Sequence, residues 1–502
     1  MDTKAGVKID RMAGRLEEIL KNREEKVARL KELGIELYPA RSKKDFSNKE
    51  VAENFEKHEG QKVTLAGRIM ALRDIGKLAF VQILDQSGRI QLFLRSDAVK
   101  PLDKEEQRLG FEELGLLDLG DFVQAYGEIV KTKTGEVSLL VEELKLLTKS
   151  RRPLPDQWAG ITDPDERYRR RYLDLLMSEG KKERFVRKAK FWEACRKFLS
   201  GKGFVEVETP VLETVTGGAD ARPFVTHMNA IDQDFYLRIS TELFQKRLIG
   251  AGFEKVYTLG PNFRNEGMDD EHLPEYYQLE WYWAYADYRD NMMLVKEMYQ
   301  YIAKEVYGKT KFVSRGLEYD LADEWVELDY ASTIKEKLGI DIFISEDRDM
   351  VETVKKHGVR LTGDVNRQRL IDNCWKIVRK TIAGPAFLVN VPKFMSPLAK
   401  DRIDMPGITE RFQPIIAGSE LGNGYSELND PIDQKERFEE QQKAREAGDE
   451  EAQMMDVDYV EMLEYGIPPT SGYGFSERLF WFMEDVSGRE ATLFPPMRVK
   501  KS

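Results

Sequence analysis

Cysteine and histidine are scarce in this sequence. Its 502 residues include two cysteines, Cys195 and Cys374, and four histidines. Two cysteines cannot build the disulfide framework of a small secreted protein, and they are too few for a cysteine-based metal cluster. The shortage of histidine argues in the same way against a histidine-based metal site. We therefore expect a protein of a reducing compartment.

Long apolar runs are also missing. The first ten residues, MDTKAGVKID, contain no apolar segment of the signal-peptide type. No apolar run approaches the roughly 20 residues that a helix needs to cross a bilayer. A content of 41% hydrophobic and 33% charged residues is typical of globular proteins in solution. We expect a cytoplasmic protein without a membrane segment.

The formal charge is negative. Seventy-eight basic and 89 acidic residues give a net charge of −11. This balance argues mildly against a protein that coats nucleic acid through bulk electrostatics, because such proteins are normally basic. It leaves open a nucleic acid that is bound by a local patch and by stacking on aromatic rings.

The length predicts two or three domains. Residues 1–60 are expected to form a helical extension, with a helix over 10–33 that Asp10 caps and Gly34 ends. The charged face of this helix is either solvated or in contact with a polyanion.

The residue pattern changes from helical to strand-like after this extension. Residues 61–150 contain about five short alternating runs separated by glycine-containing turns, which predicts a small β-barrel of the OB type. Residues 151–180 begin rich in proline and polar residues and are predicted to be a linker or hinge. Residues 181–502 form a larger region with both helical and strand-like patterns.

A predicted hairpin, FRNEGMDDEHLPEYYQLEWY over residues 263–282, contains several charges. Arg264 ends its first strand, and a guanidinium fork suits a phosphate or a carboxylate. On the return strand the period of two places Gln278, Glu280 and Tyr282 on one face. A solvated hairpin would explain these charges without a ligand. The aromatic neighbours of Glu280 favour a buried acid that a ligand pairs.

A second stretch, GSELGNGYSELNDP over residues 418–431, combines acids with glycines. Glu420 and Glu427 flank a tight polar turn that contains Asn423. Such a turn is suited to hold a hard cation or an ammonium group. The alternative is a surface loop that only happens to be acidic.

A third stretch, PPTSGYGFSERLFWFMEDV over residues 468–486, is predicted to become helical at its end. Ser476 is the expected cap, and Arg478 lies in the first turn, where the helix dipole favours an anion. A purely structural cap is the alternative. Together with Arg264, this arginine indicates a nucleotide-phosphate site beside an acidic annex.

These stretches also resemble a known family. GKGFVEVETPVLE, FRNEG...H.PEY..LE and GYGFSERL are similar to the three motifs of class II aminoacyl-tRNA synthetases. GGADARPFVTH, GNGYSELNDP, EYGIPPTSG and ATLFPPMR are closer to the lysyl-tRNA synthetases within that class. The motifs occur in the family's order, and the resemblance covers nearly the whole chain from about residue 10.

The resemblance implies an α+β fold. An N-terminal OB-fold barrel would bind the anticodon, and a catalytic domain built on an antiparallel sheet flanked by helices would follow. The first motif usually lies at a dimer interface, which implies a homodimer. The implied reaction is the ATP-dependent activation of L-lysine to lysyl-adenylate, with release of pyrophosphate, followed by transfer to the 3′ end of tRNA(Lys). It needs no side-chain nucleophile, since magnesium and arginines offset the charge at the α-phosphate.

The resemblance also assigns roles to individual residues. The catalytic residues would be Arg264 and Arg478. ATP would be bound by Arg264, Glu266, His272, Tyr276, Glu420 and Arg478. The lysine pocket would comprise Glu242, Glu280, Tyr282, Asn423, Tyr425 and Glu427. Magnesium would be held by Glu420 and, more weakly, by the uncharged Gln413. The anticodon would be read by Phe80, Gln91 and Glu136.

Lysine as the substrate has a physical argument. Several carboxylates in one site repel each other, and some would take up a proton unless a cation enters. The ammonium group of lysine supplies that cation. An aspartate pocket needs cationic groups instead, so a ligase for aspartate or asparagine is one alternative. A non-catalytic paralogue that binds RNA through its OB domain is the other.

Three positions depart from the family pattern. Gln413 stands where the family usually has an acid that binds magnesium. The third motif is one residue shorter than usual, with Ser476 where a third glycine is expected. Glu271 places an acid beside His272, near the expected outer phosphates. We therefore expect fewer or more weakly bound metal ions and a reshaped ATP end of the site.

Overall fold

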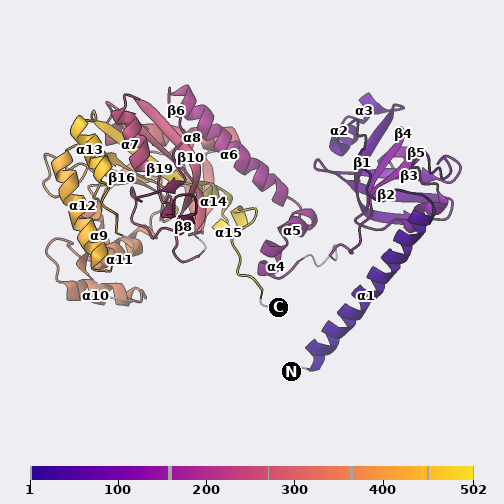
Figure 1. Ribbon diagram of the computed structural model, residues 1–502, viewed down its shortest axis with the longest axis horizontal. Helices are drawn as coiled ribbons and strands as arrows, with labels where there is room; N and C mark the ends of the chain where they lie inside the picture. The colour runs from indigo at the N-terminus through magenta and orange to yellow at the C-terminus, as the bar shows by residue number, and fades with distance from the viewer. Residues whose placement is uncertain (1–2, 156–160, 270, 362–365, 449–451, 501–502) are drawn as a thin grey trace. The chain divides into compact units, whose positions relative to one another are not determined.

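The structure is a computed structural model that describes residues 3–155, 161–269, 271–361, 366–448 and 452–500. The chain divides into two compact units, residues 1–163 and 164–502 (Figure 1). No helix among the described residues is long and apolar enough to cross a membrane.

The first unit is a closed barrel with strand order β1-β2-β3-β5-β4. Its elements are α1 Thr3–Glu32, α2 Asn48–Glu53, α3 Phe55–His58, β1 Lys62–Asp74, β2 Leu78–Leu84, β3 Arg89–Arg95, η1 Glu112–Leu116, β4 Phe122–Lys131 and β5 Val137–Thr148. The alternating apolar residues of these strands fill the barrel, so the predicted OB-type barrel is confirmed. The helix α1 begins at Thr3, so Asp10 lies inside it and not at its start, whereas Gly34 adopts a φ of +76° just beyond its end.

A buried lysine ties the barrel to the segments around it. Lys149 is 1% exposed, and its ammonium lies 2.6 Å from Asp118 Oδ2 and 2.7 Å from Asp121 Oδ2. The ammonium also donates to the Leu116 carbonyl at 2.8 Å. All three of its N–H groups thus have a protein acceptor, which is the condition under which a charge can be buried.

The second unit is built on a main sheet with strand order β14-β15-β16-β18-β19-β11-β10-β6. Its strands are β6 Val205–Glu206, β10 Lys255–Phe263, β11 Glu275–Ala284, β14 Val326–Asp329, β15 Ala386–Val389, β16 Arg411–Ile416, β17 Ser419–Glu420, β18 Asn423–Ser426 and β19 Thr470–Ser476. The sheet is antiparallel except at the β14–β15 and β10–β6 pairs near its edges. The predicted hairpin is the antiparallel β10–β11 pair, which lies between β19 and the edge strand β6.

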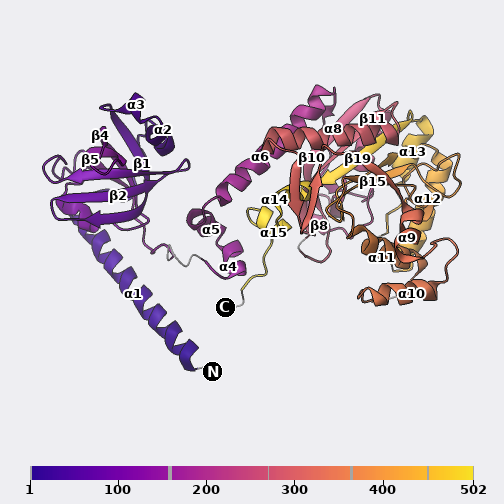
Figure 2. The same ribbon diagram turned by 180° about the vertical axis from the view of Figure 1, so that it is seen from behind.

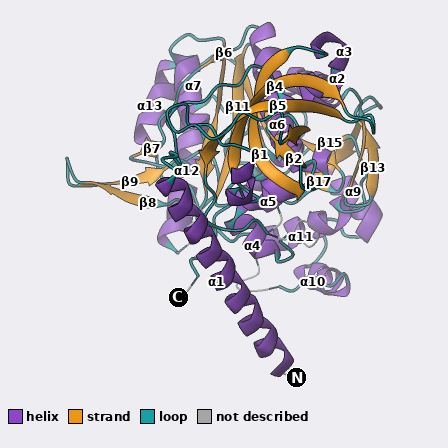
Figure 3. Ribbon diagram, turned by 90° about the vertical axis from the view of Figure 1, so that its right-hand side faces the viewer, coloured by secondary structure: helices purple, strands orange, loops and turns teal. Residues whose placement is uncertain are grey.

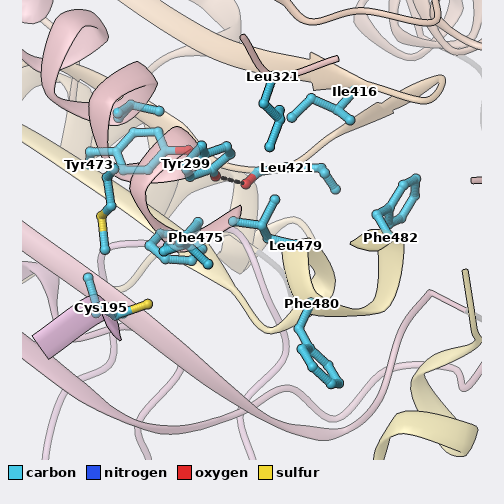
Figure 4. Close-up of a cluster of buried hydrophobic side chains, with 14 of the residues drawn as sticks. Cys195, Tyr299, Leu321, Ile416, Leu421, Tyr473, Phe475, Leu479, Phe480 and Phe482 are labelled. Carbon is cyan, nitrogen blue, oxygen red and sulfur yellow. Dashed lines mark hydrogen bonds between the residues drawn. The ribbon is translucent and has the colours of Figure 1, made fainter. Parts of the chain in front are cut away.

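Helices pack against both faces of this sheet and around it. They are α4 Pro164–Arg169, α5 Arg171–Met177, α6 Lys181–Gly201, α7 Glu242–Gly250, α8 Tyr288–Tyr307, α9 Tyr330–Leu338, α10 Asp347–Lys356, α11 Arg367–Arg379, η2 Lys393–Met395, α12 Pro431–Glu446, α13 Val457–Tyr465, α14 Arg478–Glu484 and α15 Gly488–Ala491. The helices α6 and α8 pack on each other and on the apolar side of β11 and β19 (Figure 2). In this core Tyr299 donates to the Leu421 carbonyl at 2.7 Å, close to Tyr473 (Figure 4).

The remaining strands form two smaller sheets. One comprises β7 Leu212–Glu213, β9 Gln233–Leu237 and β8 Val225–Met228, and the other comprises β12 Lys311–Ser314 and β13 Leu317–Asp320. The hairpin of β8 and β9 projects from the rest of its unit (Figure 3), and Val225 is 61% exposed. The predicted hinge, residues 151–180, includes α4 and α5, where Arg167 and Arg171 pair with Glu490.

The third sequence stretch is partly as predicted. The helix expected from Ser476 onward is present as α14, but residues 470–476, for which no strand was predicted, form a strand between β18 and β11. The helix α14 begins only at Arg478, whose N–H donates to Ser476 Oγ at 3.3 Å. The glycines explain the strand: a Cβ on Gly472 would lie 2.3 Å from the ring of Tyr282. Only a residue without a side chain lets β19 approach the residues on β11 so closely.

Candidate active site

A cavity of about 330 Å³ lies on the face of the main sheet opposite to α6 and α8. Gln278, Glu280 and Tyr282 of β11 line it, whereas Leu279 and Trp281 between them lie in the apolar core. This confirms the face predicted from the period of two. Successive residues of β11 therefore point alternately into the polar cavity and into the apolar core.

Glu280 is held at the centre of this cavity by hydrogen-bond donors. It is 3% exposed and accepts from Thr241 Oγ1 at 2.8 Å, Ser240 Oγ at 3.1 Å and Gln278 Nε2 at 2.5 Å. Burial and the neighbouring Glu242 raise the pKa of its carboxyl, although these donors oppose the rise. Glu280 is thus a fixed acid that lacks a paired cation among the described residues.

A lysine of the chain lies between two further acids of this cavity. Lys246 on α7 is fully buried, 2.5 Å from Glu242 Oε1 and in an ion pair with Glu427. Tyr425 donates to the same Glu242 oxygen at 2.7 Å. We expected a cation from the substrate, but the chain itself supplies one. The only sequence signal for it is that Lys246 follows Glu242 by one helical turn, a spacing that favours ion pairs.

Opposite these acids the cavity is lined by arginines. Arg411 on β16 donates to Asn423 Oδ1 at 2.7 Å, which fixes the side chain that the sequence assigned to the lysine pocket. Arg264 follows β10, and its Nε is buried without a hydrogen-bond partner among the described residues. A buried guanidinium N–H without an acceptor is costly, so a ligand oxygen is the natural partner.

A second cavity, of about 270 Å³, adjoins the first. It is lined by every residue that the sequence assigned to ATP, namely Arg264, Glu266, His272, Tyr276, Glu420 and Arg478. Arg264, Gln278, Asn423 and Gly474 line both cavities. A ligand in one cavity therefore meets a ligand in the other at these residues.

The far end of the second cavity contains an internal ion pair. Glu271 pairs with Arg478 and with Arg315, which lies in the turn between β12 and β13. Ser419 Oγ accepts from Arg478 at 2.6 Å and lies 3.3 Å from Glu271. Burial would raise the pKa of Glu271, but the two arginines outweigh it and hold the pKa below its usual value. A carboxylate thus occupies Arg478, which the sequence assigned to the outer phosphates. His272, assigned to the same phosphates, has its Nδ1 2.8 Å from Asp269 Oδ2.

The barrel has a groove of its own. Phe80 on β2 stacks on Phe93 of β3 with ring centroids 5.1 Å apart, and Gln91 donates to Ser138 Oγ at 2.9 Å. Basic side chains surround these rings, and they are Arg73, Lys77, Arg95, Lys131 and Lys133. Glu136 lies in the turn between β4 and β5, next to this groove but not among its lining residues. Stacked rings among cations are the features of a surface that binds single-stranded nucleic acid.

Comparisons with known proteins agree with both units. Residues 163–498 match the family described as tRNA synthetases class II (D, K and N), and residues 63–147 match the OB-fold nucleic acid binding domain. The lysine–tRNA ligase of Thermoanaerobacter pseudethanolicus is 45% identical over 490 residues, which is 97% of each chain. That of Thermotoga maritima is 44% identical over 494 residues, again 97% of each chain. The chain belongs to the class II lysine–tRNA ligases.

Membership in the lysine–tRNA ligases confirms the resemblance, the enzyme class and the α+β fold expected from the sequence. A further relative, the lysine–tRNA ligase of Pelotomaculum thermopropionicum, is 42% identical over 492 residues, covering 97% of this chain and 96% of its own. The matched class also includes D and N members, but these relatives are all named for lysine. The aspartate and asparagine alternatives are therefore disfavoured.

The class II lysine–tRNA ligases imply a metal ion, and the residues of the second cavity fit one. Glu420 lines this cavity together with Gln413; its Oε1 accepts from Trp375 at 2.5 Å and its Oε2 lies 3.8 Å from Arg379. No group of three or more His, Cys, Asp or Glu side chains with metal-binding geometry occurs in the described part of the chain. One carboxylate and one carboxamide oxygen suit Mg²⁺, which commonly takes one or two carboxylates and the phosphates of its substrate.

Proposed function

We propose that this chain joins L-lysine to tRNA(Lys) in two steps. ATP first activates lysine to lysyl-adenylate with release of pyrophosphate, and the lysyl group is then transferred to the 3′ end of the tRNA. The observation that carries the proposal is the pair of adjoining cavities, one acidic and one lined by arginines, which share Arg264. The names of the relatives support the same reaction.

The acidic cavity suits the lysine side chain and its amino groups. Glu280 is buried, rigidly held and without a paired cation, and Glu242 Oε2 has no hydrogen-bond partner among the described residues. An ammonium group would satisfy both acids, as a buried charge requires. Tyr282, Asn423, Tyr425 and Glu427 complete the proposed pocket.

The arginine-lined cavity suits ATP. Tyr276 offers a ring for the adenine, and the exposed Glu266 offers an acceptor for its exocyclic amine. Arg264 would bind the α-phosphate and the lysine carboxylate, since it lines both cavities. Arg478 and His272 would meet the outer phosphates, and Arg478 then exchanges Glu271 for a phosphate oxygen.

The chemistry of the first step needs placement more than reactive side chains. A carboxylate oxygen of lysine attacks the α-phosphorus, the bond to the bridging oxygen breaks, and pyrophosphate leaves. Arg264 and Arg478 offset the negative charge that accumulates between attack and departure. Mg²⁺, held by Glu420 and Gln413, supplies further charge neutralisation when it is bound with ATP.

The barrel supplies tRNA recognition in this proposal. Phe80 stacks on an anticodon base, while Gln91 and Glu136 hydrogen-bond to base edges. One stacked base contributes on the order of 1–3 kcal/mol. In the second step the terminal ribose hydroxyl of the tRNA attacks the carbonyl of lysyl-adenylate, and AMP leaves.

The proposal includes a homodimer in the cytoplasm. The first motif and the segment after it expose large apolar side chains, and these are Leu212 at 42%, Val225 at 61% and Ile231 at 56%. Exposed apolar residues gathered in one part of a surface indicate contact with another protein chain.

Lysine-dependent exchange of labelled pyrophosphate into ATP tests the enzyme. We expect exchange that requires lysine, ATP and Mg²⁺ and that aspartate does not support. Gln413, which lacks the charge usual at its position, favours a second candidate, an RNA-binding paralogue without catalysis. No exchange, together with retained binding of tRNA, would establish the paralogue in place of the ligase.

A further inference from the structure

The proposed function gives Lys246 no role, yet Lys246 pairs with Glu242 and Glu427, two acids that line the lysine pocket. Its side chain is fully buried, with one acid on its own helix and the other, Glu427, just beyond β18. The ring centroids of Tyr282, Tyr425 and Tyr459 lie 5.6–6.0 Å from its ammonium. A lysine in such a place retains its charge only because its partners hold it there.

The geometry makes Lys246 and its acids one electrostatic unit. Within the described residues, Lys246 is the cation that pairs with Glu242 and with Glu427. Burial opposes the charge of Lys246, but the two carboxylates outweigh it and hold the pKa of the ammonium above its ordinary value. Burial raises the pKa of Glu427, and Lys246 is the first group that counteracts this rise.

We propose that Lys246 is a positioning residue of the lysine pocket, whose ammonium keeps Glu242 and Glu427 ionised and in place before the substrate arrives. This inference rests on the proposed function, because it concerns how the same pocket attracts lysine. Without the ammonium, two like charges would share a dry site, and one carboxylate would take up a proton. That proton would have to leave each time the substrate ammonium binds.

The neighbouring groups leave few other candidates for titration. The tyrosines facing Lys246 have pKa values that burial raises above their ordinary value, so they stay neutral near physiological pH. Arg247, the next residue on α7, is paired with Asp456 and Asp458. Glu280 has a raised pKa, and burial raises the pKa of Glu213 to about 8, but both titrate in the presence or absence of Lys246.

The decisive variant is Lys246→Gln, which retains a hydrogen-bond donor and removes the charge. We expect its KM for lysine, divided by that of the wild type, to be largest near pH 6.5 and to fall by at least about tenfold towards pH 8.5, because one linked proton changes binding up to tenfold per pH unit. The direction follows from the protonated acid, which binds an ammonium weakly at low pH. The KM for ATP should stay unchanged. The measurement is pyrophosphate exchange at each pH.

Two further variants separate this role from a structural one. Lys246→Arg retains the charge, so its KM for lysine should run parallel to that of the wild type across the pH range. The double variant K246Q/E427Q removes both charges together and should also run parallel, with KM raised by a constant factor. If Lys246→Gln does not fold, the double variant still tests the proposal. A KM for lysine of K246Q/E427Q that falls with pH relative to the wild type would overturn it.

Lys149→Gln is the matched control. It removes a buried lysine between two carboxylates in the other unit, and its KM for lysine should equal that of the wild type at every pH. A constant ratio for Lys246→Gln would reduce Lys246 to a packing element and overturn the inference. Failure of the wild type to exchange pyrophosphate at all would instead overturn the proposed function, so the two failures are distinguishable.

Discussion

Lys149 in the barrel and Lys246 in the catalytic unit are each buried between two carboxylates, but their surroundings differ. Lys149 donates to Asp118, Asp121 and the Leu116 carbonyl, and the free oxygen of Asp121 accepts from the Ser150 N–H at 2.7 Å. Around Lys246, in contrast, Glu242 has an oxygen without a partner among the described residues, on the wall of a cavity.

The difference separates a structural cluster from a binding cluster. In the barrel the chain satisfies every charge by itself, so no ligand is needed and the cluster fixes how segments meet. In the catalytic unit three acids, Glu242, Glu280 and Glu427, line a cavity beside one lysine, and the remaining negative charge attracts a cation. A cluster that remains short of cations can bind substrate, but at a cost in stability.

The largest expected effect is on the cluster around Lys149 in the barrel. Lys149→Met leaves Asp121 buried without a cation, while Asp118 keeps Lys26 at 2.9 Å. We therefore expect the free energy of unfolding of the barrel to fall by about 3–5 kcal/mol. Urea unfolding followed by hydrogen exchange of barrel peptides measures this loss. Lysine-dependent exchange of the folded enzyme should stay at the wild-type level.

Lys57→Met is the control for Lys149→Met, because Lys57 is exposed on α3. Its effect should stay within about 0.5 kcal/mol. If Lys149→Met were equally mild, the barrel cluster would not be the structural device that the comparison describes.

Glu280→Gln should show the opposite behaviour. Removing this charge should lower kcat/KM for lysine about 10²- to 10³-fold, in line with the loss of a buried charge partner, while KM for ATP stays unchanged. Folding raises the pKa of Glu280, so its charge destabilises the folded state above the ordinary pKa of a glutamate, and increasingly so as the pH rises. The variant should therefore unfold at a higher temperature than the wild type at neutral pH.

The exposed Glu275→Gln on the same strand is the control for Glu280→Gln and should change neither quantity. Loss of stability in Glu280→Gln, with lysine kinetics intact, would place Glu280 in the same class as the acids around Lys149.

A smaller effect is expected on the binding surface of the barrel. Phe80→Ala removes a stacking surface and should weaken tRNA(Lys) binding by roughly 1–3 kcal/mol, which is about 5- to 150-fold. Pyrophosphate exchange without tRNA should be unaffected, because Phe80 lies in the other unit. Filter binding measures the affinity, with the exposed Tyr38→Ala as the control. Unchanged affinity would remove this groove from the anticodon site.

Local patterns in the sequence predicted much of this architecture. Alternation with a period of two placed Glu280 on the cavity face of β11 and Trp281 in the core, because strand geometry decides the face of each residue. Glycine-punctuated alternation likewise predicted the barrel. The strand β19 was missed, since glycines and serines have no strand preference and only its partners β11 and β18 make it a strand.

Local sequence patterns did not predict the ion pairs of the site. Glu427 meets Lys246, and Glu271 meets Arg315, only because distant segments converge in the fold. No spacing rule connects such residues, so the sequence showed acids that need a cation without showing which cation the chain already has. Arg264, in contrast, was identifiable because its motif concentrates charge in one short loop.

The smallest expected effect concerns Glu271, which pairs with Arg478 in the ATP cavity. ATP must displace this partly exposed acid from Arg478, and such a pair contributes at most about 1 kcal/mol. Glu271→Gln should therefore lower the KM for ATP by about 3- to 5-fold and leave the KM for lysine unchanged, with the exposed Glu324→Gln as the control. A rise in the KM for ATP, steepest at low Mg²⁺, would mean that Glu271 helps ATP to bind and does not compete with it. Glu271 would then supply the negative charge that Gln413 lacks, and its pairing with arginine would be the resting state of a metal ligand.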